Sequence, residues 1–218
     1  MATEIIATVV EGGKNVALRK RGDIYEVILG NVVLLSSAAL ETELEFGRLA
    51  KVSLTPFREP RRVLVGGLGF GSTLRGVLEV AAPDAEVLVA EKLHAVVGFV
   101  NNEVAHVAAG VLSDPRVTLL EEDVGEVIRR ERNLDAILLD VDNGPEWASF
   151  RSNARIYAAE ALAEAKRALV PEGIFAVWSG YAKDAFVASL RTAGFRPEII
   201  ALREGKTVRA RAYVGHAL

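Results

Sequence analysis

The sequence contains no cysteine, and this absence excludes several kinds of site at once. Disulfides, zinc–thiolate sites, iron–sulfur clusters and thiol catalysis all require cysteine sulfur. Histidine is also scarce, with 3 residues among 218. His94 and His106 fall on different faces of a helical stretch and His216 lies in the C-terminal tail, a pattern unlike that of metal ligands. We therefore expect no metal.

Long apolar runs and a charge excess of one sign are missing as well. No run of about 18 uncharged apolar residues occurs, so we expect no membrane span. The N-terminal stretch MATEIIATVV carries Glu4 and is unlike a signal peptide, which favours a cytoplasmic location. The formal net charge is −3, which offers no basic surface for nucleic acid. With 50% hydrophobic and 25% charged residues, the chain suits a folded domain with an ordinary core.

The first part of the chain has the pattern of a small antiparallel sheet. Short β-rich runs are separated by glycine-containing turns, and they span residues 3–10, 15–20, 24–29 and 32–35. Apolar residues at helical intervals then predict a helix from Ala38 to about Leu54, before Pro56 and Pro60. We therefore predict an N-terminal β-meander over residues 1–37 and a helix with a linker over 38–60.

Residues 61–218 alternate between strand and helix patterns. Continuous apolar runs indicate strands at 62–66, 86–90, 116–120, 134–139 and 173–178, with helical segments between them. This alternation predicts an α/β domain with a doubly wound, mostly parallel, Rossmann-like sheet. Two final strand patterns, at 196–201 and 208–214, are joined by a short connector. They predict an antiparallel hairpin at one sheet edge.

A run of alternating glycines, Gly67, Gly69 and Gly71, directly follows the first strand of this sheet. Glycine there allows a sharp turn and lets a ligand approach the backbone. The dinucleotide fingerprint would need glycine or alanine where this chain has Ser72, which disfavours a nicotinamide cofactor. A P-loop is disfavoured because no Gly-Lys-Ser or Gly-Lys-Thr follows, and a serine-hydrolase elbow is absent.

Acidic residues follow the successive strands. Glu91 ends the second strand, at the position where a doubly wound fold places an acid against a ribose. Asp123 follows the third strand, and Asp140 and Asp142 follow the fourth. Each acid alone could simply begin a helix or cap a turn. Their succession along one sheet edge favours a nucleoside-binding site.

These segments resemble one known family. The stretches VLVGGLGFGSTLRGVLE, VLVAEKLHAVV, DPRVTLLEEDVGEVI and DAILLDVDNGP are similar to those of the polyamine aminopropyltransferases, of which spermidine synthase is the type. That family has the fold of class I S-adenosylmethionine-dependent methyltransferases. The resemblance implies that Gly67, Gly69 and Gly71 face the methionine-derived part of S-adenosylmethionine or its decarboxylated form. It also implies that Glu91 holds the ribose and that Asp123 lies near the adenine.

The resemblance further implies aminopropyl transfer to a small-molecule amine and a homodimer with the N-terminal strands between subunits. In the family, an Asp-x-x-Asp-Pro-x-Gly-Pro loop follows the fourth strand. Here that loop reads Asp140-Val141-Asp142-Asn143-Gly144-Pro145 and is two residues shorter. The resemblance assigns Asp140 to the cofactor and to catalysis, Asp142 to the catalytic base, and Asp142, Asn143 and Glu43 to acceptor binding. Glu43 is the one residue kept from the family's motif on the first helix.

Two alternatives remain open at this point. The first is a methyltransferase that uses intact S-adenosylmethionine, whose carboxylate Arg75 could neutralise. The second is a homologue without catalytic activity that binds a nucleoside or oligomerises. Trp147 and Tyr157 flank the acidic loop and could wall a pocket, although packing roles are also open to them.

Overall fold

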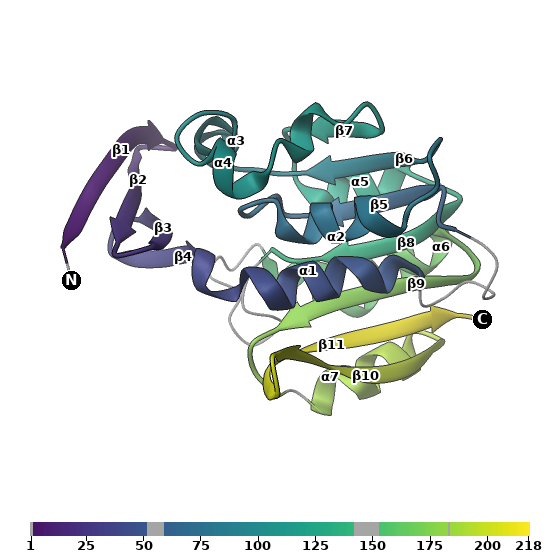
Figure 1. The fold of residues 1–218 in the computed structure, drawn as a ribbon. Helices are drawn as coiled ribbons and strands as arrows, with labels where there is room; N and C mark the ends of the chain where they lie inside the picture. Colours follow the sequence, from purple (N-terminus) through teal and green to yellow (C-terminus); the bar gives the residue numbers. More distant parts are fainter. Residues whose placement is uncertain (1, 52–58, 142–152, 183) are drawn as a thin grey trace.

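The computed structural model describes residues 2–51, 59–141, 153–182 and 184–218. Two sheets dominate it, a four-stranded antiparallel sheet at the N-terminus and a seven-stranded mixed sheet (Figure 1). Among the helices of these described ranges, none combines the length and the apolar character needed to cross a bilayer.

The N-terminal sheet is the predicted meander. Its strands pair antiparallel in chain order and are β1 (Thr3–Glu11), β2 (Lys14–Arg21), β3 (Ile24–Leu29) and β4 (Val32–Ser36). Val16, Leu18 and Val27 are fully buried and belong to the same hydrophobic core as the large sheet. The outer strands leave apolar side chains exposed, for example Val10 and Val32. The small sheet therefore depends on its packing against the rest of the chain.

The large sheet confirms the predicted fold class. Its order is β10-β11-β9-β8-β5-β6-β7, with parallel pairing from β9 to β7 and an antiparallel hairpin, β10 and β11, on the β9 side. The strands are β5 (Arg62–Gly66), β6 (Glu86–Ala90), β7 (Val117–Leu120), β8 (Leu134–Leu139), β9 (Leu169–Ser179), β10 (Phe195–Glu204) and β11 (Thr207–Ala217). The predicted strand positions are confirmed, including the edge hairpin.

Helices cover both faces of this sheet, as the continuous apolar strands require. One core holds α1 (Leu40–Arg48), α2 (Ser72–Val80), α3 (His94–Asn101) and α4 (Ala105–Ala108), with the 3-10 turns η1 (Ser37–Ala39), η2 (Leu49–Lys51) and η3 (Val111–Ser113) beside them. The other core holds η4 (Asn153–Tyr157), α5 (Val124–Arg130), α6 (Ala159–Ala168) and α7 (Asp184–Thr192). Of the helix predicted from Ala38 to about Leu54, α1 with the 3-10 turns η1 and η2 accounts for the part up to Lys51, and residues 52–54 lie outside the described residues.

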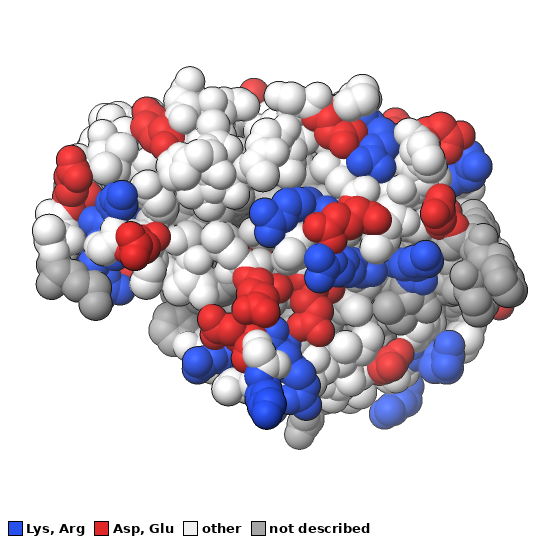
Figure 2. Space-filling view, viewed as in Figure 1, with Lys and Arg blue, Asp and Glu red and all other residues white. Residues whose placement is uncertain are grey.

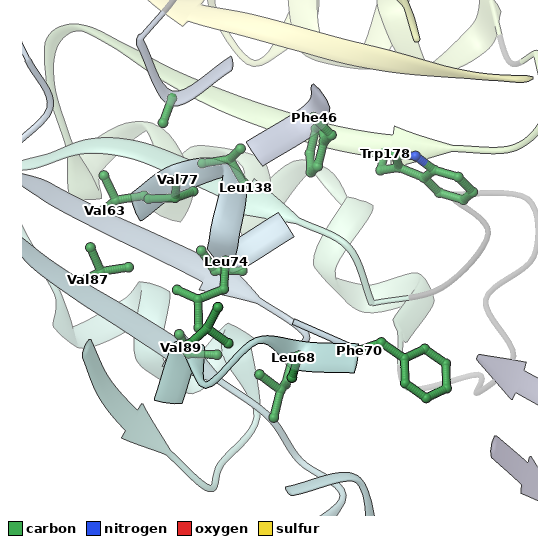
Figure 3. Packing of buried hydrophobic residues seen from close by; sticks show 14 of the residues in the cluster. Phe46, Val63, Leu68, Phe70, Leu74, Val77, Val87, Val89, Leu138 and Trp178 are labelled. Carbon is green, nitrogen blue, oxygen red and sulfur yellow. The ribbon is translucent and has the colours of Figure 1, made fainter. Parts of the chain in front are cut away.

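Helices α1 and α2 meet backbone to backbone. A Cβ atom on Gly47 would lie 2.1 Å from the carbonyl oxygen of Thr73, and one on Gly76 would lie 2.2 Å from that of Leu44. Figure 3 shows Phe46 of α1 lying with the apolar side chains of α2 above the sheet. This close approach brings the first turns of α1 and α2 to the edge of the sheet where β5 and β8 end.

Candidate active site

A cavity opens at the carboxyl ends of the parallel strands, where open α/β sheets bind ligands. Its empty volume is about 860 Å³ including the open mouth. The predicted residues that line it are Gly67, Gly69, Glu91, Asp123 and Asp140. Leu34 and Leu35 of β4 close one side, so the N-terminal sheet contributes directly to the wall. Most of the cofactor-binding residues predicted from the sequence therefore line one cavity.

The glycines of the loop after β5 have separate tasks. Gly67 has a φ of 89°, and a Cβ atom there would lie 2.3 Å from the carbonyl oxygen of Asp140. Gly69 has a φ of 53° and nothing within 4 Å of its Cβ position, which leaves its backbone open to the cavity. Gly71 does not line the cavity, because its Cβ position faces Val111 at 2.9 Å at the start of α2.

Glu91 is the buried carboxylate of the cavity, with 8% of its surface exposed. Its Oε2 accepts a hydrogen bond from the amide of Leu68 at 3.0 Å, and its Oε1 accepts one from the amide of Leu93 at 2.8 Å. Burial raises the pKa of Glu91, the backbone amides lower it, and the charge of Glu11 raises it further. Each carboxylate oxygen can accept a second hydrogen bond, so Glu91 suits a pair of hydroxyl groups.

Asp123 lines the cavity as the N-cap residue of α5. Its Oδ1 accepts from the amide of Gly125 at 2.9 Å, and its Oδ2 accepts from Lys92 Nζ at 3.2 Å. Lys92 is the one cationic residue among the described residues that line the cavity. Glu122 lines it as well and pairs with Arg130. The charged wall is therefore mainly acidic.

A second acidic group gathers where α1, α2 and β8 meet. Thr73 Oγ1 donates a hydrogen bond to Asp140 Oδ2 at 2.6 Å. Burial raises the pKa of Glu43 well above its ordinary value, and the charge of Asp140 raises it further. Glu43 does not line the first cavity, but it lies close enough to Asp140 for the two carboxyl groups to interact.

A second cavity opens beside the first turn of α1. Its empty volume is about 750 Å³ including its opening, and it is lined by Ala38, Glu41, Thr42, Trp178, Glu204 and Arg209. Thr42 directly precedes Glu43, whereas Asp140 lines the first cavity. Glu204 and Arg209 of the β10–β11 hairpin form an ion pair at 3.0 Å. In Figure 2, acidic and basic side chains lie interspersed over the part of the surface formed by this hairpin and α1.

Three other residues singled out from the sequence, Arg75, Tyr157 and Trp178, do not line the first cavity. Asp142, Asn143 and Trp147 lie outside the described residues. Arg75 lines a separate groove beside Asp114 and Arg116 rather than the cavity that holds Glu91. Tyr157 packs edge-on against Phe186 with their ring centres 5.7 Å apart, which is a packing role. Trp178 is buried and belongs to the core, although its indole N–H has no partner among the described residues.

Sequence reasoning missed three contributors to the site. Thr73 follows the glycine loop directly, and its position in the first turn of α2 could have indicated a partner for Asp140. Lys92 follows Glu91 directly and could have been paired with Asp123 by strand order. Leu34 and Leu35 carry no such signal, because only the packing of the N-terminal sheet brings them to the cavity. Among the described residues, no three acidic or histidine side chains gather closely enough to hold a metal ion.

Comparison with known proteins agrees with this architecture. No family model matches the chain. It is 29% identical over 163 residues to polyamine aminopropyltransferase 1 of Hyperthermus butylicus, a match covering 68% of this chain and 51% of the relative. It is 31% identical over 131 residues to polyamine aminopropyltransferase 2 of Pseudomonas aeruginosa, covering 58% of this chain and 37% of the relative. The chain resembles the polyamine aminopropyltransferases. It spans about half the length of the first of these curated relatives and 37% of the second.

Solved structures extend the resemblance to the whole fold. The spermidine synthase of Thermotoga maritima superimposes with a TM-score of 0.74 at 17% identity, covering 98% of this chain and 73% of that one. A spermidine synthase in complex with the transition-state analogue AdoDATO superimposes with a TM-score of 0.73 at 16% identity, covering 98% and 72%. At these identities the agreement shows the fold, and the aminopropyltransferase resemblance marks the chain as a divergent relative.

Proposed function

We propose that this chain transfers an aminopropyl group from decarboxylated S-adenosylmethionine to a small-molecule amine. The observation that carries the proposal is the buried carboxylate of Glu91 at the end of β6, in a cavity that Asp140 also lines. The named relatives are aminopropyltransferases, and the solved structures of this fold include a spermidine synthase bound to a transition-state analogue. No observation of this chain favours methyl transfer or a purely binding role.

The residues present fit an adenosyl sulfonium substrate. In this proposal Glu91 accepts hydrogen bonds from the ribose hydroxyls while it stays tied to the amides of Leu68 and Leu93. Asp123 lies beside the adenine, and the backbone at Gly69 admits the sulfonium arm because no side chain fills that space. These assignments keep the roles that the sequence resemblance implied.

The charges of the cavity favour the decarboxylated form of the substrate. Intact S-adenosylmethionine carries a carboxylate, and that group would need a cation or free amides near the glycine loop. Lys92 is paired with Asp123, and Arg75 lines another groove. Asp140 instead places negative charge at this end of the cavity, with Glu43 behind it. An aminopropyl ammonium group complements such charges, whereas a carboxylate is repelled.

The substrate supplies its own leaving group, so the protein must position the amine and remove a proton. The amine nitrogen forms a bond to the propyl carbon beside sulfur. The carbon–sulfur bond breaks, its electrons stay on sulfur, and a neutral thioether leaves. A free amine has a pKa of about 10, so a carboxylate must attract the ammonium form and then accept its proton. We assign this work to Asp140 with Glu43 beside it, and to Asp142, which lies outside the described residues.

The second cavity is our candidate for the acceptor side. It is lined by Thr42, the neighbour of Glu43 in the chain, and by the acidic residues Glu41 and Glu204, of which Glu204 pairs with Arg209. Carboxylates at that position would attract a cationic amine. We also propose a homodimer, because β1 and β4 leave Ile5, Val10 and Val32 exposed on the N-terminal sheet. Exposed apolar side chains on the outer strands of a sheet are consistent with a protein interface.

Mass spectrometry tests the proposed reaction directly. Purified protein is incubated with decarboxylated S-adenosylmethionine and 1,4-diaminobutane, and both expected products, methylthioadenosine and the aminopropylated amine, are quantified. The Asp140→Asn variant should lose at least about 100-fold in rate, since it removes a positioned carboxylate. The Glu79→Gln variant, altered in an exposed residue paired with Arg48, is the matched control. Methylthioadenosine without the aminopropylated product would contradict transfer to the amine.

A further inference from the structure

The carboxylate of Glu11, the last residue of β1, lies on the first turn of α3. Its Oε1 accepts a hydrogen bond from the amide of His94 at 2.9 Å, and its Oε2 accepts one from the amide of Ala95 at 3.0 Å. Figure 1 shows the end of β1 directed toward α3. The opening amides of a helix have no partner within the helix, so this carboxylate supplies one from another sheet.

Glu91 accepts a hydrogen bond from the neighbouring amide of the same turn. The amide of Leu93 donates to Glu91 Oε1 at 2.8 Å, and the amide of Leu68 in the glycine loop donates to the other oxygen at 3.0 Å. Three consecutive amides are thus shared between two carboxylates, one from the nucleoside cavity and one from the N-terminal sheet. Moving Glu11 away would release the turn that aims the Leu93 amide at Glu91.

We propose that Glu11 is a positioning residue of the nucleoside site, holding the first turn of α3 so that Glu91 is fixed for binding a ribose diol. This inference rests on the proposed function, because it assumes that Glu91 meets a ribose. Glu11 itself does not line the cavity and acts only through the turn. The nucleoside site therefore depends on the packing of the N-terminal sheet against α3.

The charge of Glu11 gives this role a signature that simple packing lacks. Two carboxylates at one turn repel each other, and Glu11 accordingly raises the pKa of Glu91, in addition to the larger effect of burial. The other charged groups at this turn form pairs, Lys92 with Asp123 and His94 with Glu121. His94 carries a raised pKa, caused first by its hydrogen bond to Glu121 and then by the charges of Glu121 and Glu11.

The test measures the affinity for 5′-methylthioadenosine by calorimetry between about pH 5 and pH 8. Binding should weaken as acid protonates Glu91, because a protonated carboxyl accepts fewer hydrogen bonds. In Glu11→Gln the repulsion between the two carboxylates is absent. The pH below which acid weakens binding, here called the acid limb, should therefore move down by about half a pH unit. Affinity at neutral pH should fall about threefold, because the amide side chain keeps one acceptor oxygen for the turn. Glu4→Gln, an exposed change on the same strand, is the matched control and should leave both values unchanged.

The outcomes separate this inference from the proposed function. If the wild-type protein binds the nucleoside and Glu11→Gln leaves the acid limb where it was, the positioning role is wrong and the proposed function stands. A uniform loss of affinity at every pH would also overturn the role, since it would indicate packing alone. If the wild-type protein does not bind the nucleoside, the proposed function fails and this inference fails with it. Thermal melting of each variant verifies that it is folded.

Discussion

At the residue scale, the proposed nucleoside binding depends most on Glu91. It is buried in the cavity and tied to two backbone amides, so its orientation is fixed before any ligand arrives. We expect Glu91→Gln to weaken binding of 5′-methylthioadenosine about tenfold at pH 7, because an amide has one acceptor oxygen instead of two. Calorimetry measures this, and the pH-dependent loss of affinity expected of the wild type should vanish in the variant. Unchanged affinity would exclude Glu91 from the ribose contact.

Thr73 is the second residue with a specific expected effect. Its hydroxyl donates to Asp140 at 2.6 Å and itself lies buried at the start of α2. Thr73→Val keeps the shape and removes this hydrogen bond to Asp140, so we expect kcat for aminopropyl transfer to fall about tenfold with little change in nucleoside affinity. Thr73→Ser should restore most of the rate. Equal rates for the valine and serine variants would mean that the hydroxyl does not orient Asp140.

At the scale of elements, the contact between α1 and α2 positions Glu43 beside Asp140. Gly76→Ala would place a methyl group 2.2 Å from the carbonyl oxygen of Leu44, so the helices must separate. We expect a loss of about 2 kcal/mol in the free energy of unfolding, measured by urea denaturation. Gly98→Ala in α3 is the matched control, since nothing lies within 4 Å of its Cβ position. That control should stabilise the protein by about 0.5–1 kcal/mol, and a similar gain for Gly76→Ala would contradict the packing account.

The elements were more predictable from sequence than the contacts between them. Strand alternation located the sheet, and the order of strand ends brought Glu91, Asp123 and Asp140 to one cavity. Those predictions succeed because the hydrophobic period of a strand and the residues that follow it are local in the sequence, and because parallel strands end at the same edge of the sheet. The cap that Glu11 provides for α3 and the approach of α1 to α2 arise from residues far apart in the sequence. No local pattern distinguishes them, and Gly47 and Gly76 resemble ordinary helix-weakening glycines until the helices are packed.

At the scale of the whole molecule, the carboxyl pair of Glu43 and Asp140 should lower the stability of the folded state at neutral and alkaline pH. The folded state raises the pKa of Glu43, so it holds a proton that the unfolded chain releases at lower pH. Stability therefore falls as pH rises from the unfolded value through the folded one. Glu43→Gln removes this loss, and its Tm should exceed that of the wild type by about 2–4 °C at pH 8.

The comparison of Tm between Glu43→Gln and the wild type at acid pH tests this explanation. Near pH 4 the carboxyl is largely protonated in both states, so the difference in Tm between Glu43→Gln and the wild type should nearly disappear. Differential scanning calorimetry at both pH values measures it. A variant that melts below the wild type at pH 8 would show that the charged pair stabilises the fold, contrary to the direction that the raised pKa of Glu43 implies. Aminopropyl transfer by this variant should be slower than that of the wild type, because the proposed mechanism has Glu43 assist Asp140.

The central claim is that the cavity accepts a decarboxylated sulfonium nucleoside, and one calorimetric comparison tests it most directly. The wild-type protein and Glu91→Gln are titrated with decarboxylated and with intact S-adenosylmethionine under identical conditions. The acidic end of the cavity predicts at least about tenfold tighter binding of the decarboxylated form, and a weakening of that binding in Glu91→Gln. Equal or tighter binding of the intact form would contradict aminopropyl transfer and indicate methyl transfer. Absence of binding for both would contradict the nucleoside site itself.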